Sequence, residues 1–83
     1  MLASKIQKHF SSLTRQQKKI AEQLLSLGHE AAFLTISQMS RQFGTSESAI
    51  VRFARALGYG GYPALQKELQ DAVREKLSPP RAL

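Results

Sequence analysis

Residues 35–58 read TISQMSRQFGTSESAIVRFARALG and carry the signals of two short helices joined by a tight turn. Thr35 can cap the first helix with its hydroxyl, and Gln38, three residues later, can complete a capping box. Gly44 follows the last apolar residue of that helix, where a helix C-terminus favours left-handed backbone. Ser46 can cap the second helix. Two capped helices with a three-residue connection containing glycine form the sequence pattern of a helix-turn-helix.

Each of these two helices carries one apolar face. The apolar positions are Ile36, Met39 and Phe43 in the first helix, and Ile50, Phe53, Ala54 and Leu57 in the second, which ends at Gly58. Their helical spacing predicts that both helices pack on a common core. The opposite face of the second helix is polar and bears arginines, which suits the major groove of DNA. Any helix pair in a small bundle shares such a turn and such faces, so this pattern alone leaves generic helix packing open.

The distribution of charge bears on these two interpretations. The chain has 83 residues and a net charge of +6, from 12 basic and 6 acidic side chains. Up to residue 60 there are eight basic and three acidic residues, a surplus of +5, and beyond it the charges nearly cancel. A surplus in the segment that holds the helix pair is typical of a surface that binds a polyanion. The sequence therefore favours nucleic acid, and a helical protein–protein interaction module with a basic docking surface is the alternative.

Helix signals dominate the rest of the chain, and convincing strand alternation is absent. We expect helices over residues 2–10, between the cap at residue 14 and Gly28, and over residues 63–77, where Pro63 suits a first turn. Residues 29–34 are expected to add a turn of helix whose apolar side chains fill the core: Ala31, Ala32, Phe33 and Leu34. The predicted fold is all-α, a small helical bundle of about five helices that contains the helix-turn-helix.

The last predicted helix has an apolar stripe that allows two interpretations. Leu65, Leu69, Val73 and Leu77 recur every four residues, so they drift around the helix and do not form a sustained heptad. The stripe can pack on its own domain or pair with the same helix of a second subunit. Residues 78–83, SPPRAL, cannot continue a helix and are expected to be a linker or an added tail. The helix-turn-helix DNA-binding domain is accordingly expected to span residues 1–77.

Several function classes find no support in the sequence. The chain lacks cysteine, and His9 and His29 lie in unrelated contexts, so no metal site is expected. There is no glycine-rich phosphate loop and no nucleophile–base pair, so we expect neither an enzyme nor a cofactor. No segment has the apolar length of a signal peptide or a membrane span, and a cytoplasmic location with no membrane partner is expected.

At these residues the chain resembles the N-terminal helix-turn-helix domain of the RpiR family of bacterial transcriptional regulators. The similar segments are LTRQQKKIAEQLL at 13–25, AAFLTISQMSRQFGTSESAIVRFARALGYGGYPAL at 31–65, and, within the latter, Ser46 with residues 49–53 and 57–62. One departure is Ser40, where the family more often has alanine. Serine is scarcely larger and can return its hydroxyl to a carbonyl one turn back, so the fold is expected to survive.

The resemblance implies a domain that is normally followed by a sugar-isomerase-like (SIS) domain, which binds phosphosugars and oligomerises. That second domain is absent from this sequence, so a phosphosugar effector is expected only on the missing part. The resemblance further implies double-stranded DNA as the partner, a homo-dimer or higher assembly, and control of sugar or sugar-phosphate metabolism. The predicted function is sequence-specific DNA binding as part of a transcription regulator.

The candidate DNA-binding residues lie on the second helix of the pair and on the elements before it. They are Ser46, Glu47, Ser48, Val51, Arg52, Arg55, Thr45, Ser37, Gln38, Arg41, Lys18 and Lys19. The fork of Arg52 can engage O6 and N7 of guanine together, although Arg52 can instead pair with Glu47 or Glu30. Glu47 can accept from a cytosine amino group or stabilise the helix dipole. The other cations suit phosphates, and Tyr59 and Tyr62 are expected to pack on the core.

Overall fold

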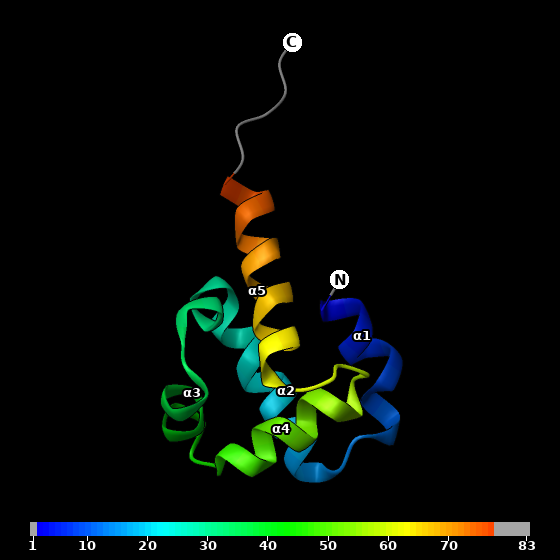
Figure 1. Ribbon diagram of the computed structural model, residues 1–83. Coiled ribbons are helices and arrows are strands. Elements are labelled where there is room, and N and C mark those ends of the chain that lie inside the picture. Colours follow the sequence, from blue (N-terminus) through cyan, green and yellow to red (C-terminus); the bar gives the residue numbers. More distant parts are fainter. Residues whose placement is uncertain (1, 78–83) are drawn as a thin grey trace.

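Five α-helices and two 3₁₀ helices make up the chain over the residues that the computed structural model describes, which are 2–77 for the backbone and 2–74 for side chains (Figure 1). In chain order they are α1 (Leu2–His9), η1 (Phe10–Ser12), α2 (Arg15–Leu27), η2 (Gly28–Phe33), α3 (Ile36–Phe43), α4 (Glu47–Ala56) and α5 (Tyr62–Leu77). No strand occurs within this range. The all-α prediction with about five helices is confirmed, whereas the linker expected at 78–83 lies outside the described residues.

Capping boxes begin two of these helices, as the sequence predicts. The Thr14 hydroxyl accepts from the backbone N–H of Gln17 at 3.1 Å, and the Gln17 side chain accepts from the Thr14 N–H at 3.0 Å. Thr35 and Gln38 form the same reciprocal pair at 3.1 and 2.9 Å. Each box satisfies two backbone donors that a helix start would otherwise leave unpaired, so the starts of α2 and α3 are fixed locally.

The turn between α3 and α4 has the predicted glycine and cap. Gly44 adopts φ 66° and ψ 36°, the left-handed region that costs glycine little. The Ser46 hydroxyl then accepts from the N–H of Ala49 at 3.1 Å and begins α4. The helix-turn-helix expected from residues 35–58 is therefore present, and α4 takes the position of its second helix.

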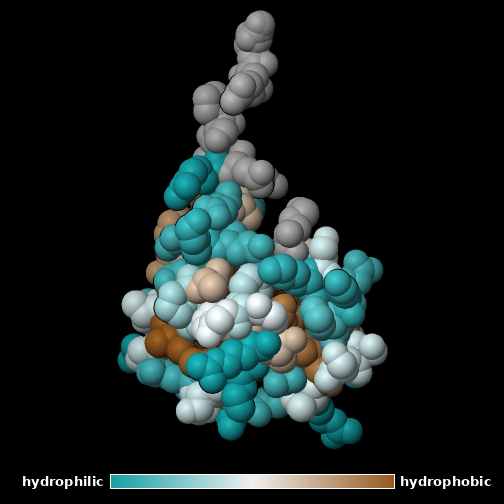
Figure 2. Space-filling model, turned by 45° about the vertical axis from the view of Figure 1, so that its right-hand side comes forward, coloured by the Kyte–Doolittle hydropathy of each residue, from teal (hydrophilic) through white to brown (hydrophobic). Residues whose placement is uncertain are grey.

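One face of α4 lies on the core, where the helix packs against α2, α3 and α5. The largest fully buried side chains are Phe53, Ile20, Leu24, Met39, Ile50, Leu57 and Leu65. They come from α2, α3, α4, the start of the α4–α5 connection and α5, so one cluster ties the helices together. In Figure 2, hydrophilic residues dominate the visible face and apolar residues form only small patches, as expected once the apolar stripes are inside.

Helix α5 packs on η2 with its N-terminal part and extends beyond the other helices at its far end (Figure 1). Leu65, Leu69 and Val73 are all buried within the chain, at 0%, 7% and 9% exposed. Of the two interpretations of this stripe, intramolecular packing is therefore the one observed for these three residues. The side chain of Leu77 lies outside the described residues.

The prediction that Phe33 fills the core is wrong. Its side chain is 70% exposed, whereas Ala31 and Ala32 are fully buried and Leu34 is half-buried. In the 3₁₀ helix η2, side chains three residues apart share a face, and Phe33 lies on the exposed side together with Glu30. The consecutive residues Ala31 and Ala32 are the ones that face inward. The small side chains of the two alanines suit the close packing of α5 on η2.

Tyr62 joins α5 to the end of η2. Its ring is buried, and its hydroxyl donates to the Leu34 carbonyl at 2.6 Å, while the Gln66 side-chain amide donates to the same oxygen at 2.8 Å. Burial raises the pKa of Tyr62 above its ordinary value of 10.0, because the phenolate is less well solvated there. Tyr59 is half-buried against the core, with the Lys5 ammonium 4.2 Å from its ring centre. Both tyrosines thus pack as predicted.

Replacing Tyr62 with phenylalanine is expected to lower the free energy of unfolding by about 1 kcal/mol at pH 7, since one hydrogen bond is lost and the ring remains. That difference should shrink as the pH rises past about 10, because the unfolded parent then releases the phenolic proton that its folded state retains. Thermal melts of both chains at pH 7 and pH 11 measure this. An equal difference in melting temperature at the two pH values would show that the raised pKa of Tyr62 does not contribute to stability.

Candidate nucleic-acid interface

Helix α4 has a buried face and an exposed polar face. Ala49, Ile50, Phe53 and Ala54 are between 0% and 3% exposed and hold the helix on the core. The residues predicted to reach DNA lie on the other side: Glu47, Ser48, Arg52 and Arg55 are exposed, and Val51 is half-buried. Helix α4 runs along the end of the molecule opposite the tip of α5 (Figure 1), and the exposure of these side chains shows that the face is open to solvent. The position suits a helix that enters a groove.

The start of α4 is held by contacts from two other helices. The Thr45 backbone N–H donates to the Ser40 carbonyl of α3 at 2.9 Å. The Thr45 hydroxyl accepts from the side-chain amide of Gln16, in the first turn of α2, also at 2.9 Å. Ser46 follows directly and is exposed. The first turn of α4 is therefore fixed relative to both α2 and α3, which is a requirement for reading bases at defined positions.

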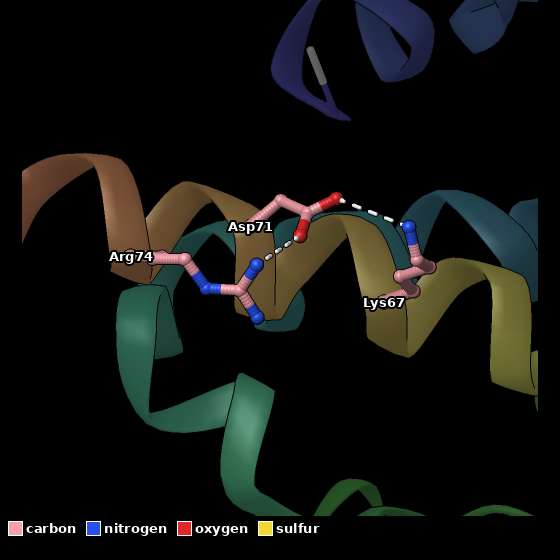
Figure 3. Close-up of polar contacts among 3 residues, drawn as sticks. All are labelled: Lys67, Asp71 and Arg74. Carbon is pink, nitrogen blue, oxygen red and sulfur yellow. Dashed lines mark ion pairs between the residues drawn. The ribbon is translucent and has the colours of Figure 1, made fainter.

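The arginines around α4 have no carboxylate partner among the described side chains. Arg41, Arg52 and Arg55 are exposed and take part in no ion pair with the acidic residues of 2–74, so the alternative pairing of Arg52 with Glu47 or Glu30 is not observed. On α5, by contrast, Asp71 lies 3.6 Å from Arg74 and 3.9 Å from Lys67 (Figure 3). Uncompensated positive charge is thus gathered at the helix-turn-helix.

Helix α3 presents Ser37, Gln38 and Arg41 on its exposed surface. The Gln38 oxygen is engaged in the capping box, which leaves its NH₂ group for an outside acceptor. Ser40 is 6% exposed, and its hydroxyl donates to the Ser37 carbonyl at 2.9 Å, which confirms the back-bonding expected where the family more often has alanine. Because α3 has eight residues, Ser37 lies about 10 Å along the helix from the turn.

The two lysines predicted on α2 differ in their surroundings. Lys19 is exposed. Lys18 is half-buried, and its ammonium lies 5.3 Å from the centre of the Phe10 ring in η1, a cation–π distance. Lys18 therefore has an intramolecular role, and the structure does not bring it together with the other predicted residues.

A surface hollow of about 400 Å³ is lined by the first turns of α2 and by the turn before α4. Arg15, Gln16 and Lys19 line one side, and Gly44 and Thr45 line the other. Sequence reasoning singled out Lys19 and Thr45 but missed Arg15 and Gln16. The only signal was the i, i+4 spacing of Arg15 and Lys19, which cannot tell which other helix they face.

Two kinds of site are not found within the part of the chain that the structure describes. No three or more His, Asp or Glu side chains there gather in a way that could hold a metal ion. No helix within residues 2–77 combines the length and the apolar character that crossing a bilayer requires.

The geometry agrees with what known proteins show. A family described as the helix-turn-helix domain of the rpiR family matches residues 1–76. The chain belongs to this family. It is 34% identical over 76 residues to YfhH, an uncharacterized HTH-type transcriptional regulator of Escherichia coli, and this match covers 92% of the chain and 27% of YfhH. It is 29% identical over 72 residues to the HTH-type transcriptional regulator HexR of Pseudomonas aeruginosa, covering 87% of the chain and 25% of HexR.

Membership in the rpiR family confirms the resemblance found in the sequence. The chain is a helix-turn-helix domain of DNA-binding transcriptional regulators, which is not an enzyme class. It spans about a quarter of the length of the two relatives. No solved structure shows a significant match to it. The DNA contacts of individual residues stay predictions.

Proposed function

We propose that this chain binds a specific double-stranded DNA sequence with α4 as the recognition helix. The observation that carries the proposal is the exposed face of α4, where Arg52 and Arg55 lie without carboxylate partners among the described residues beside a well-capped turn. A recognition helix needs such a face, because specific contacts come from side chains that reach base edges in the major groove.

Each part of this face suits a different kind of contact. Arg52 is one turn from the start of α4 and would read guanine through O6 and N7. Glu47 and Ser48 in the first turn would meet neighbouring base edges, and half-buried Val51 would contact a thymine methyl. The phosphate contacts are assigned to residues that surround this group, namely Arg41, Arg55, Lys19, Thr45, Ser46, Ser37 and Gln38. Lys18 is left out because its ammonium faces Phe10.

The wider role follows from the family and concerns a longer protein. We propose a bacterial regulator of sugar or sugar-phosphate metabolism that acts in the cytoplasm, where its DNA lies. A phosphosugar effector would bind a SIS domain outside this chain, since the chain spans only about a quarter of its relatives. Genomic neighbours of the gene would test the metabolic role, which genes unrelated to sugars would contradict.

Tight binding is expected to require two copies of the chain on an inverted repeat. One recognition helix spans only a few base pairs, and helix-turn-helix proteins commonly pair half-sites about one DNA turn apart. Because Leu65, Leu69 and Val73 are buried in their own domain, the free chain should be largely monomeric and pair mainly on DNA. Sedimentation at rising concentration, with and without a selected duplex, measures this. Nanomolar binding of a single half-site by a strict monomer would contradict it.

Replacing Arg52 with alanine should lower DNA affinity and relax sequence preference while the fold stays intact. The side chain is exposed and makes no described ion pair, so its loss leaves no cavity. Loss of a bidentate guanine contact costs about 1–3 kcal/mol and broadens the choice at one base-pair position. The measurement is selection of duplexes from a randomised library by the parent and the variant.

Arg55→Ala is the matched comparison for Arg52→Ala. It removes the same side chain less than one turn away, and we expect weaker binding to all sequences alike with a salt slope reduced by about one. An unchanged motif and affinity for Arg52→Ala would remove Arg52 from the site. If the parent binds no duplex at low salt, the docking of an acidic protein becomes the better interpretation of the basic surface.

A further inference from the structure

We propose that the first turns of α2 form a second DNA contact, in which Arg15 and Lys19 bind one backbone phosphate beside the start of α4 and Gln16 positions them. This inference rests on the proposed function, because it adds a phosphate site to the same complex. Arg15, Gln16 and Lys19 lie nearly thirty residues before α4 in the chain, so only the folded structure brings this contact next to α4.

The link between the two elements is the hydrogen bond from the Gln16 amide to the Thr45 hydroxyl, at 2.9 Å. Thr45 is adjacent to Ser46, the cap of α4. A single side-chain hydrogen bond therefore connects the first turn of α2 to the residue next to the cap of α4. Both also lie at the end of the molecule opposite the tip of α5 (Figure 1).

The cations at this place are oriented together and are not neutralised. Arg15, Gln16 and Lys19 lie on one face of α2 and line the same hollow as Gly44 and Thr45. No acidic side chain lines that hollow, and neither cation has an ion-pair partner among the described residues. Arg15 and Lys19 are one helical turn apart, so both can approach a single anion in the opening. The planar guanidinium of Arg15 can hold two oxygens of one phosphate.

The expected path of DNA brings a phosphate to this opening. When a recognition helix enters the major groove, its N-terminal residues contact base edges. The sugar–phosphate strand that borders the groove at that end then runs next to the first turn of α4. The elements available to meet it are the turn before α4 and the side chains that border the turn, which are those of Arg15, Gln16 and Lys19. Lys18 cannot take this role while its ammonium lies over Phe10.

Three variants of the 83-residue chain test this inference, each of which lowers the net charge by one. Arg15→Gln removes one of the two proposed phosphate ligands, the guanidinium, and leaves Lys19. Gln16→Glu keeps an oxygen that can accept from the Thr45 hydroxyl but places a negative charge in the hollow. Lys67→Gln is the control, because Lys67 is exposed on α5 and outside the proposed interface. Circular dichroism melts check that all three fold like the parent.

The probes are a duplex that the parent selects from a randomised library and a pool of unselected duplexes of equal length. By counterion release, losing one phosphate contact should weaken binding roughly eightfold at 0.1 M salt, for both probes, and reduce the log–log salt slope by about 0.9. Because Lys19 stays beside the same phosphate, we expect for Arg15→Gln a several-fold loss of affinity that does not exceed this figure. We expect at least as large a loss for Gln16→Glu, and a near-parental slope for Lys67→Gln. Neutral methylphosphonates placed one at a time in the selected duplex should reveal one position whose effect is smaller in Arg15→Gln than in the parent.

The outcomes separate this inference from the function on which it rests. If the parent binds neither probe, the proposed function fails and the phosphate contact with it. If the parent binds but Arg15→Gln and Gln16→Glu behave like Lys67→Gln, DNA binding stands and the α2 contact is refuted. A methylphosphonate effect that is equally large in the parent and in Arg15→Gln at every position also refutes it.

Discussion

Replacing Phe53 with alanine is expected to remove most of the folding free energy of this chain. Phe53 is 0% exposed and lies in the middle of α4, in the cluster that joins α2, α3, α4 and α5. Deleting a buried phenyl ring costs about 3–5 kcal/mol, because transfer free energy is lost and a cavity is left behind. A domain of this size has a total stability of only about 4–12 kcal/mol. Thermal unfolding followed by circular dichroism measures the loss, which should lower the melting temperature by at least about 12 °C.

Phe33→Ala is the matched control, since it deletes the same ring at a position that is 70% exposed. Its effect should stay within about 0.5 kcal/mol, as for most surface substitutions. Equal melting temperatures for Phe53→Ala and the parent would show that Phe53 is not part of the core. A large loss in Phe33→Ala would show instead that Phe33 is covered in solution.

The loss of Phe53 should also abolish DNA binding, although the side chain faces away from the proposed interface. The exposed arginines of α4 can hold a fixed register only while the opposite face of that helix stays on the core. Arg52→Ala is therefore expected to lower DNA affinity in a domain that stays folded. Phe53→Ala is expected to lower it because the domain that positions the arginine unfolds.

The sequence predicted the helices well because their signals are local. Thr14, Thr35 and Ser46 each bond a backbone N–H three residues ahead, so cap and helix start are adjacent in the chain. The apolar stripe of α4 repeats with the helical period, and Ala49, Ile50, Phe53 and Ala54 are all buried. The turn needed one left-handed residue and has Gly44 there.

The features that the sequence did not predict depend on contacts between distant residues. The orientation of Phe33 follows from the 3₁₀ geometry of η2 and from the packing of α5 on it. The hydrogen bond from Gln16 to Thr45 joins residues that are 29 positions apart, so no local sequence pattern predicts this contact. Lys18 and Lys19 are neighbours in the sequence, yet one faces the Phe10 ring and the other lines the hollow beside Thr45. The sequence thus predicted which helices carry the site residues, but it did not predict the direction in which individual side chains point.

DNA affinity is expected to fall steeply with salt. Arg41 and Arg55 are each expected to meet one phosphate, and Arg15 and Lys19 share another, so each copy makes about three phosphate contacts that release condensed counterions. At roughly 0.9 per contact, the slope of log affinity against log salt should be near −2.7 per copy. Affinity should then fall about 40-fold between 50 and 200 mM salt. Fluorescence anisotropy with one labelled duplex at five or more salt concentrations gives the slope.

The salt dependence of affinity distinguishes a chain with a defined basic interface from a chain that is merely basic overall. A net charge of +6 spread over the whole surface would steer DNA to the chain without fixing a number of contacts. A slope set by named contacts should instead drop by about 0.9 for Arg55→Gln and stay unchanged for Lys67→Gln, although both remove one charge. Equal slopes in these two variants would show that the arginine lies off the DNA. A flat dependence in the parent would count against DNA as the partner altogether, because phosphate neutralisation supplies nearly all sequence-independent affinity.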